Sequence, residues 1–187
     1  MKHVFTIHSP ITFLVAYATI KHLQLEPNEV IIISSKYKVP INDYRVIPSF
    51  VEARNSSFLQ KIKYFNVPKC FNQYLNPFLN GEAFIAYIDL MSYYQKILVT
   101  HHRCKSFNFI EEGTSTYQVK DNLDDITWHE RKEDWRSSSV IDFKSLVRMF
   151  RGYNLRLLSL PYIYSAYVNK ESISFFAFSN NAFYNVS

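Results

Sequence analysis

The segment 111–116 reads EEGTST and joins two adjacent carboxylates to a glycine and three hydroxyl residues. One acid of such a pair can face a crevice while the other turns away. The acid in the crevice can act as a general base where burial or its neighbour raises its pKa. Gly113 is expected where the backbone needs a positive φ or a close approach to a ligand. We therefore take Glu111 and Glu112 as candidate catalytic residues.

A structural role would also explain the two acids. Acidic side chains are common in the first turn of a helix, where they lie near the positive end of the helix dipole. If Glu111 and Glu112 only begin a helix, replacing them would change stability slightly and leave activity intact. Both interpretations stay open at this point, as does the choice between the two acids.

A second candidate segment lies near the amino terminus, where a β-branched and aromatic run ends at His8, Ser9 and Pro10. Ser9 can cap the following helix, and Pro10 suits the first helical position because proline lacks the amide hydrogen that has no partner there. In open α/β sheets, ligands bind beyond the carboxyl ends of the strands. The segments 8–10 and 111–114 both fall at such ends.

Other patterns that carry chemistry are missing from the sequence. With 3 glycines, the chain has no glycine-rich dinucleotide motif and no phosphate-binding loop. The adjacent His101 and His102 would point apart on a helix or strand, so a loop explains them better than a metal site. Cys70 and Cys104 lack the paired spacing of a zinc site and are too few for a disulfide framework. We expect no metal and no bound cofactor.

Apolar runs and helical periodicities alternate along the chain and would position these segments. Strands are expected at 3–8, 29–34, 83–88, 106–110 and 173–178. Helices are expected at 12–25, 54–65, 91–101 and 141–153, and a polar loop at 118–140. This alternation predicts a single α/β domain over residues 1–187, with three layers and a mainly parallel sheet.

The composition limits the classes of partner. Apolar residues make up 48% of the chain, which excludes a disordered protein. The 21 Lys and Arg residues exceed the 16 Asp and Glu residues by 5, but both signs are interspersed, as in the ERKED segment 130–134. Because a nucleic-acid binder usually has a basic block, we expect no nucleic-acid partner. The surplus fits nucleotides, acidic sugars or anionic lipid headgroups equally well.

The sequence also bears on location. No run reaches the 18 or so apolar residues that span a bilayer, and segment 8–10 interrupts the first apolar run where a signal peptide needs an unbroken stretch. With both cysteines interpreted as reduced thiols, a cytoplasmic location is expected. Peripheral contact with a membrane surface stays open.

Three segments resemble bacterial polysialyltransferase-like and lipooligosaccharide sialyltransferase-like glycosyltransferases. Segment 5–16, FTIHSPITFLVA, is similar to their opening, in which a strand ends in a histidine-hydroxyl-proline turn and leads into the first helix. Segment 109–115, FIEEGTS, resembles their acidic-acidic-glycine motif. Segment 174–183, which includes Ser179, Ala182 and Phe183, looks like the strand that closes their N-terminal domain.

The resemblance implies a Rossmann-like half of a two-domain GT-B glycosyltransferase of capsule or lipooligosaccharide synthesis. An acid of the Glu111-Glu112 pair would deprotonate a glycan hydroxyl, which attacks the anomeric carbon of CMP-sialic acid without a metal. His8 and Ser9 would lie in the acceptor cleft. The further candidates for substrate binding are Gly113, Thr114 and Ser115.

One feature departs from the family. The histidine-proline and serine/threonine-rich motifs that hold the nucleotide belong to the family's second domain, and this chain contains no His-Pro pair. We therefore expect a second Rossmann-like domain or chain, or a second copy, to complete the catalyst. The alternative is a non-catalytic α/β binding or scaffold module derived from such an enzyme.

Overall fold

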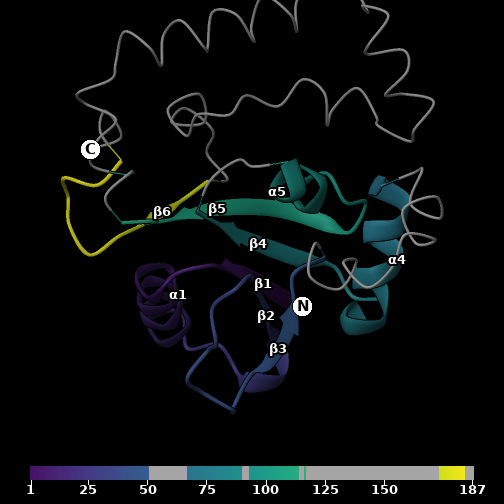
Figure 1. Ribbon diagram of the computed structural model, residues 1–187, viewed down its shortest axis with the longest axis horizontal. Coiled ribbons are helices and arrows are strands. Elements are labelled where there is room, and N and C mark those ends of the chain that lie inside the picture. Colours follow the sequence, from purple (N-terminus) through teal and green to yellow (C-terminus); the bar gives the residue numbers. More distant parts are fainter. Residues whose placement is uncertain (51–66, 90–92, 114–115, 117–172, 184–187) are drawn as a thin grey trace, which may run out of the picture.

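A parallel sheet of six strands forms the centre of the computed structural model, which describes residues 1–50, 67–89, 93–113, 116 and 173–183 (Figure 1). The strands are β1 (Lys2–Ile7), β2 (Val30–Ser34), β3 (Arg45–Pro48), β4 (Phe84–Ile88), β5 (Cys104–Ile110) and β6 (Phe175–Phe176). The described helices are α1 (Pro10–His22), the short 3-10 helix η1 (Pro27–Glu29), α4 (Val67–Leu79) and α5 (Tyr93–Val99). The expected α/β class with a parallel sheet is confirmed.

The strand order across the sheet is β3-β2-β1-β4-β5-β6, and all five neighbouring pairs are parallel. The chain therefore runs outward from β1 to β3 and then returns to the other side of β1 with β4. This order is that of a Rossmann-like fold, and the direction reverses between β1 and β4. The crevice outside the carboxyl ends of these two strands is the place where open α/β sheets bind ligands.

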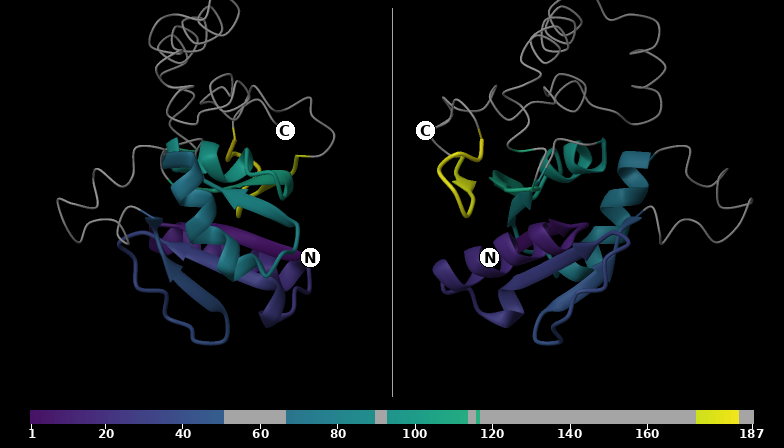
Figure 2. Two further views of the ribbon diagram at one scale, coloured as in Figure 1. Left: turned by 90° about the vertical axis from the view of Figure 1, so that its right-hand side faces the viewer. Right: turned by 60° about the vertical axis from the view of Figure 1, so that its left-hand side comes forward.

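Helices cover both faces of the sheet. Figure 1 shows α1 below the strands and α5 above them, and the second view of Figure 2 separates α1 from α4. Along β1, Val4 belongs to the apolar cluster shared with α4 and α5, while Phe5 and Ile7 belong to the cluster shared with α1. Successive side chains of a strand point to opposite faces, so one strand contributes to two cores. The described residues thus form three layers.

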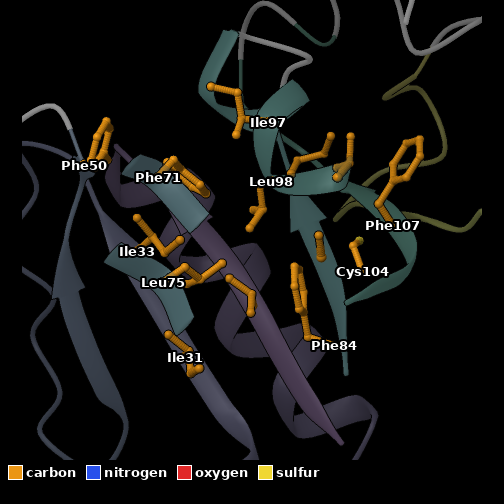
Figure 3. Close-up of a cluster of buried hydrophobic side chains, with 14 of the residues drawn as sticks. Ile31, Ile33, Phe50, Phe71, Leu75, Phe84, Ile97, Leu98, Cys104 and Phe107 are labelled. Atoms are coloured by element: carbon orange, nitrogen blue, oxygen red, sulfur yellow. The ribbon is translucent and has the colours of Figure 1, made fainter. Parts of the chain in front are cut away.

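The core on the α4 side is built from side chains that recur at helical spacing. Phe71, Leu75 and Leu79 lie four residues apart on α4 and belong to one apolar cluster with Ile31 and Phe84 of the sheet. Figure 3 shows Phe71 and Leu75 of this cluster beside the strands. Leu75, Leu79 and Phe84 have no exposed surface. Removing one such leucine side chain typically costs about 2–5 kcal/mol of the free energy of unfolding. This packing fixes the strands whose ends carry the polar residues described below.

The beginning of α1 is fixed by its own residues. Ser9 caps the helix by accepting a hydrogen bond from the amide of Thr12 at 3.2 Å, and Thr12 Oγ1 accepts from the amide of Ser9 at 3.0 Å. Pro10 occupies the first turn, as the sequence predicts. The reciprocal bonds hold the turn between β1 and α1, which carries His8.

Most predicted elements occur with shifted ends. The predicted strands 3–8, 29–34, 83–88, 106–110 and 173–178 correspond to β1, β2, β4, β5 and a two-residue β6, and the predicted helices 12–25 and 91–101 correspond to α1 and α5. The predicted helices 54–65 and 141–153 and the predicted loop 118–140 lie outside the described residues. Three elements of the described residues were not predicted, namely β3, α4 and the short helix η1.

Candidate active site

Polar side chains gather where the carboxyl ends of β1, β4 and β5 meet. His8 directly follows β1, Asp89 directly follows β4, and Glu111 and Glu112 follow β5. Because β4 lies between β1 and β5 in a parallel sheet, these four residues come to one edge. Residues separated by about a hundred positions in the chain thereby form one cluster at the reversal point of the sheet.

His8 lies between two carboxylates. Its Nδ1 forms an ion pair with Asp89 Oδ2, and its Nε2 lies 3.3 Å from Glu112 Oε1. The Asp89 side chain is 2% exposed, that of Glu112 17% and that of His8 39%. The cluster therefore reaches from the buried end of β4 to the surface.

The two carboxylates determine the charge of His8. The hydrogen bond to Asp89, followed by the one to Glu112, raises the pKa of His8 to about 10, while partial burial opposes the rise. A neutral imidazole can donate one hydrogen bond, whereas the imidazolium donates from both nitrogens. At neutral pH, His8 is thus a cation that donates to both carboxylates, and it is not a proton acceptor.

Glu111 is buried and forms hydrogen bonds to the segment around β6. Its side chain is among the buried ones, with 4% exposure, and its Oε2 accepts a hydrogen bond from the amide of Phe178 at 2.9 Å. The Glu111 amide in turn donates to the carbonyl of Phe176 at 2.9 Å. Glu111 therefore ties the end of β5 to the chain that leaves β6, and it is Glu112 that joins His8.

Gly113 allows the chain to turn directly after Glu112. Its φ is +108°, the positive value that the sequence suggests. A β-carbon at this position would lie 3.0 Å from Cδ1 of Ile11 on α1. The turn is closed by Thr116, whose amide donates to the Gly113 carbonyl at 3.0 Å and whose Oγ1 accepts from the Glu112 amide at 3.0 Å. These contacts hold the backbone of Glu112 against the amino-terminal end of α1.

The other residues predicted to bind substrate are Ser9, Thr114 and Ser115. The hydroxyl of Ser9 takes part in the cap of α1, and binding of substrate by Ser9 stays a prediction. Thr114 and Ser115 lie outside the described residues. Among the described residues, the structure brings together His8, Glu112 and the backbone of Gly113, and it turns the carboxylate of Glu111 to the β6 side.

Sequence reasoning missed Asp89 and Gln95. The Gln95 side-chain amide on α5 donates to Asp89 Oδ1 and, at 3.0 Å, to Thr6 Oγ1 on β1. The available signal was position, because Asp89 is the first residue after a buried strand, as His8 and Glu111 are. Applying the same criterion to the strand 83–88 would have identified it. Gln95 has no such signal, since its role depends on how α5 packs.

Other features outside this cluster do not add a site. No group of three or more His, Cys, Asp or Glu side chains in the described part of the chain could hold a metal ion. His101 and His102 stack with ring centroids 4.4 Å apart, and His101 Nδ1 accepts from the Arg103 amide at 3.0 Å. Among the helices of the described residues, none is long and apolar enough to cross a membrane.

Comparison with known proteins gives no relative. No protein-family model matches the chain, and neither a curated protein nor a solved structure matches it. The function must therefore be argued from the fold and from the cluster at its edge.

Proposed function

We propose that this chain is the acceptor-side unit of a glycosyltransferase of the sialyltransferase type, with Glu112 as the general base. The donor would be a CMP-activated sugar such as CMP-sialic acid. The acceptor would be a glycan of a bacterial surface polysaccharide, either capsule or lipooligosaccharide. A second Rossmann-like domain or chain, or a second copy, would hold the nucleotide, and the assembly would work in the cytoplasm at the face of the inner membrane.

The observation that carries this proposal is the ion pair between Glu112 and His8 at the reversal point of a Rossmann-like sheet. Ligands of open α/β sheets bind at this edge, so a carboxylate held there is well placed to act on one. Glu112 is partly exposed, whereas Glu111 is buried and accepts a backbone hydrogen bond. Of the two acids, Glu112 is therefore the one that a substrate can reach.

The charge of the cluster supports an acceptor sugar at this edge in preference to a nucleotide. Three acidic residues, Asp89, Glu111 and Glu112, and the one imidazolium of His8 give the cluster a formal net charge of −2. A phosphate brought to the same place would meet a like charge, which disfavours its binding. A neutral sugar hydroxyl can instead donate a hydrogen bond to a carboxylate. This charge agrees with a nucleotide held elsewhere in the complete enzyme.

The proposed reaction needs one proton transfer from the acceptor. The acceptor hydroxyl donates to the Glu112 carboxylate, which takes the proton as the oxygen attacks the anomeric carbon of the donor. The bond between that carbon and the phosphate oxygen of CMP breaks, and CMP leaves with the bonding electrons. General-base catalysis of this kind typically contributes about 100-fold to 10,000-fold to the rate. His8 keeps Glu112 oriented by donating to it.

Ligand binding by the chain tests this proposal without the second domain. The imidazole signals of His8 should shift in NMR spectra when lactose or sialyllactose is added at millimolar concentration, and CMP should leave them unchanged. His8→Gln identifies the signals, and Lys38→Gln, which removes an exposed positive charge, is the matched control for net charge. A chain that binds CMP at His8 and no oligosaccharide would contradict the acceptor-side role. A chain that binds neither would favour the scaffold module.

A further inference from the structure

Asp89 is a carboxylate in a position where carboxylates are rarely tolerated. Its side chain is 2% exposed, and burying an ionised carboxylate is costly unless it is paired and hydrogen-bonded. Both of its oxygens have partners, because Oδ2 pairs with His8 Nδ1 and Oδ1 accepts from the Gln95 amide. Because each oxygen has at least one partner, the orientation of the carboxylate is defined.

The partner on the inner side is itself anchored to the sheet. The Gln95 side-chain nitrogen also donates to Thr6 Oγ1 at 3.0 Å, and Thr6 Oγ1 donates to the carbonyl of Tyr87 at 3.3 Å. Thr6 lies on β1 and Tyr87 on β4, the two strands between which the chain direction reverses. Asp89 is therefore held by a chain of hydrogen bonds that ends on the backbone of the sheet.

The partner on the outer side is His8. When Nδ1 donates to Asp89, the opposite ring nitrogen, Nε2, points away from the buried carboxylate, and in the structure it lies 3.3 Å from Glu112 Oε1. Rotation of the ring would break the contact with a buried charge, which is costly. The position of Nε2, and with it the donor offered to Glu112, thus depends on Asp89.

We propose that Asp89, supported by Gln95 and Thr6, is a positioning residue that holds the His8 ring as a two-sided donor and thereby orients the Glu112 carboxylate. Asp89 is buried behind the partly exposed His8, so it acts through His8 and does not touch a substrate. For its consequence in catalysis this inference rests on the proposed function. The protonation state of His8 between Asp89 and Glu112 can be measured whether or not the proposed function is correct.

The test is an NMR titration of the histidine rings of the whole chain. Wild-type His8 should carry protons on both ring nitrogens at pH 7.5, a value chosen as about one unit above the ordinary histidine pKa, and should titrate near pH 10. Asp89→Asn should lower the His8 pKa by about 1–3 units, the usual effect of losing an opposite charge in contact. Glu112→Gln should lower it less, because Asp89 is the larger cause of the shift. Asp43→Asn, an exposed acid, should leave it unchanged.

Two titration results would overturn the inference. One is a wild-type His8 that titrates near its ordinary pKa of about 6.5, which would show that neither carboxylate holds the ring. The other is an unchanged His8 pKa in Asp89→Asn, because an Asp89 that only packs the core would not move it. If Asp89→Asn does not fold, the wild-type and Glu112→Gln titrations still decide.

Kinetics of the completed transferase separate this inference from the proposed function. Asp89→Asn should lower kcat about 10-fold or more and change KM for the acceptor little, since Glu112 stays present but is less well oriented. An assembly with no transfer to any acceptor would refute the proposed function and leave the titration result standing. Normal kcat together with a lowered His8 pKa would refute the positioning role alone.

Discussion

Glu111 and Glu112 are neighbours in the sequence, yet their carboxylates bind different parts of the molecule. Glu111 Oε2 accepts the Phe178 amide at 2.9 Å, whereas Glu112 Oε1 lies 3.3 Å from His8 Nε2. The turn at Gly113 follows them immediately, with its φ of +108°. One acid thus stabilises the sheet edge, and the other joins the polar cluster.

This division predicts opposite effects for the two acids. Glu111→Ala should lower the free energy of unfolding by about 1–3 kcal/mol, because the hydrogen bond between the buried Glu111 side chain and the Phe178 amide is lost. Glu112→Gln should change stability by less than about 1 kcal/mol, because its partner is a partly exposed histidine. In the completed transferase, Glu112→Gln should lower kcat about 100-fold to 10,000-fold. Urea unfolding and steady-state kinetics measure the two effects.

Glu111→Gln is the matched control, because its amide oxygen can still accept from Phe178 while the charge is lost. Full activity of Glu112→Gln, or a 100-fold loss of kcat in a well-folded Glu111→Gln, would show that Glu112 is not the general base.

Gly113 gives a second prediction through its contact with α1. Gly113→Ala should destabilise the chain by about 1–3 kcal/mol from backbone strain, with an added cost because the new methyl would lie 3.0 Å from Ile11 Cδ1. Gly81→Ala is the control, since φ there is +82° but nothing lies within 4 Å of an added methyl. In thermal unfolding, the Tm of Gly113→Ala should be lower than that of Gly81→Ala.

Ile11→Val removes the Cδ1 atom that the new methyl would approach. Combined with Gly113→Ala, it should recover part of the difference between the two glycine variants. Equal losses of stability in Gly113→Ala and Gly81→Ala would show that the Ile11 side chain can move away from the new methyl without an energetic cost.

How much of the fold local patterns predict depends on burial. The run at β2 was found because all five of its residues are buried and the first four are apolar, the pattern of a central strand. The edge strand β3 was missed because Arg45, Val46 and Pro48 are exposed and only Ile47 faces the core. Helix α4 was missed because Pro77 lies inside it, although its apolar residues recur every four positions.

The candidate site was only partly accessible to sequence reasoning. His8 and the acid pair were found because each follows a recognisable strand. Their meeting depends on strand order, which places β4 between β1 and β5 and which no local pattern reveals. For the same reason, the sequence could not tell that Glu112 and not Glu111 would join His8.

The cap of α1 predicts a third outcome. Ser9→Ala should lower the free energy of unfolding by about 1 kcal/mol, because the Thr12 amide loses its side-chain acceptor. Ser9→Asp should keep stability close to that of the wild type, since aspartate is as good a cap. A Ser9→Asp variant that is stable but no longer binds an oligosaccharide would indicate that the hydroxyl also contacts the acceptor. Urea unfolding and NMR binding measurements separate these effects.

His101 predicts how stability depends on acid. The residue is 2% exposed, and its Nε2 has no hydrogen-bond partner among the residues that the structure describes. Burial, together with the nearby His102 and Arg103, lowers the pKa of His101 from 6.5 to about 4. In the unfolded chain the ring takes up a proton near pH 6.5. The unfolded state therefore binds more protons than the folded state between pH 6.5 and pH 4, and the free energy of unfolding must fall as the pH drops through that window.

The variant His101→Asn tests this dependence, because it keeps an acceptor for the Arg103 amide and cannot titrate. Relative to wild type, it should therefore gain about 3 kcal/mol in free energy of unfolding between pH 7 and pH 4. His3, whose pKa is also lowered, and His8, whose pKa is raised, contribute to the pH dependence of stability with opposite signs. Because both histidines are present in the wild type and in His101→Asn, their contributions cancel in the difference between the two proteins. Parallel urea-unfolding curves for the two proteins across this range would show that His101 accepts its proton in the folded state without cost.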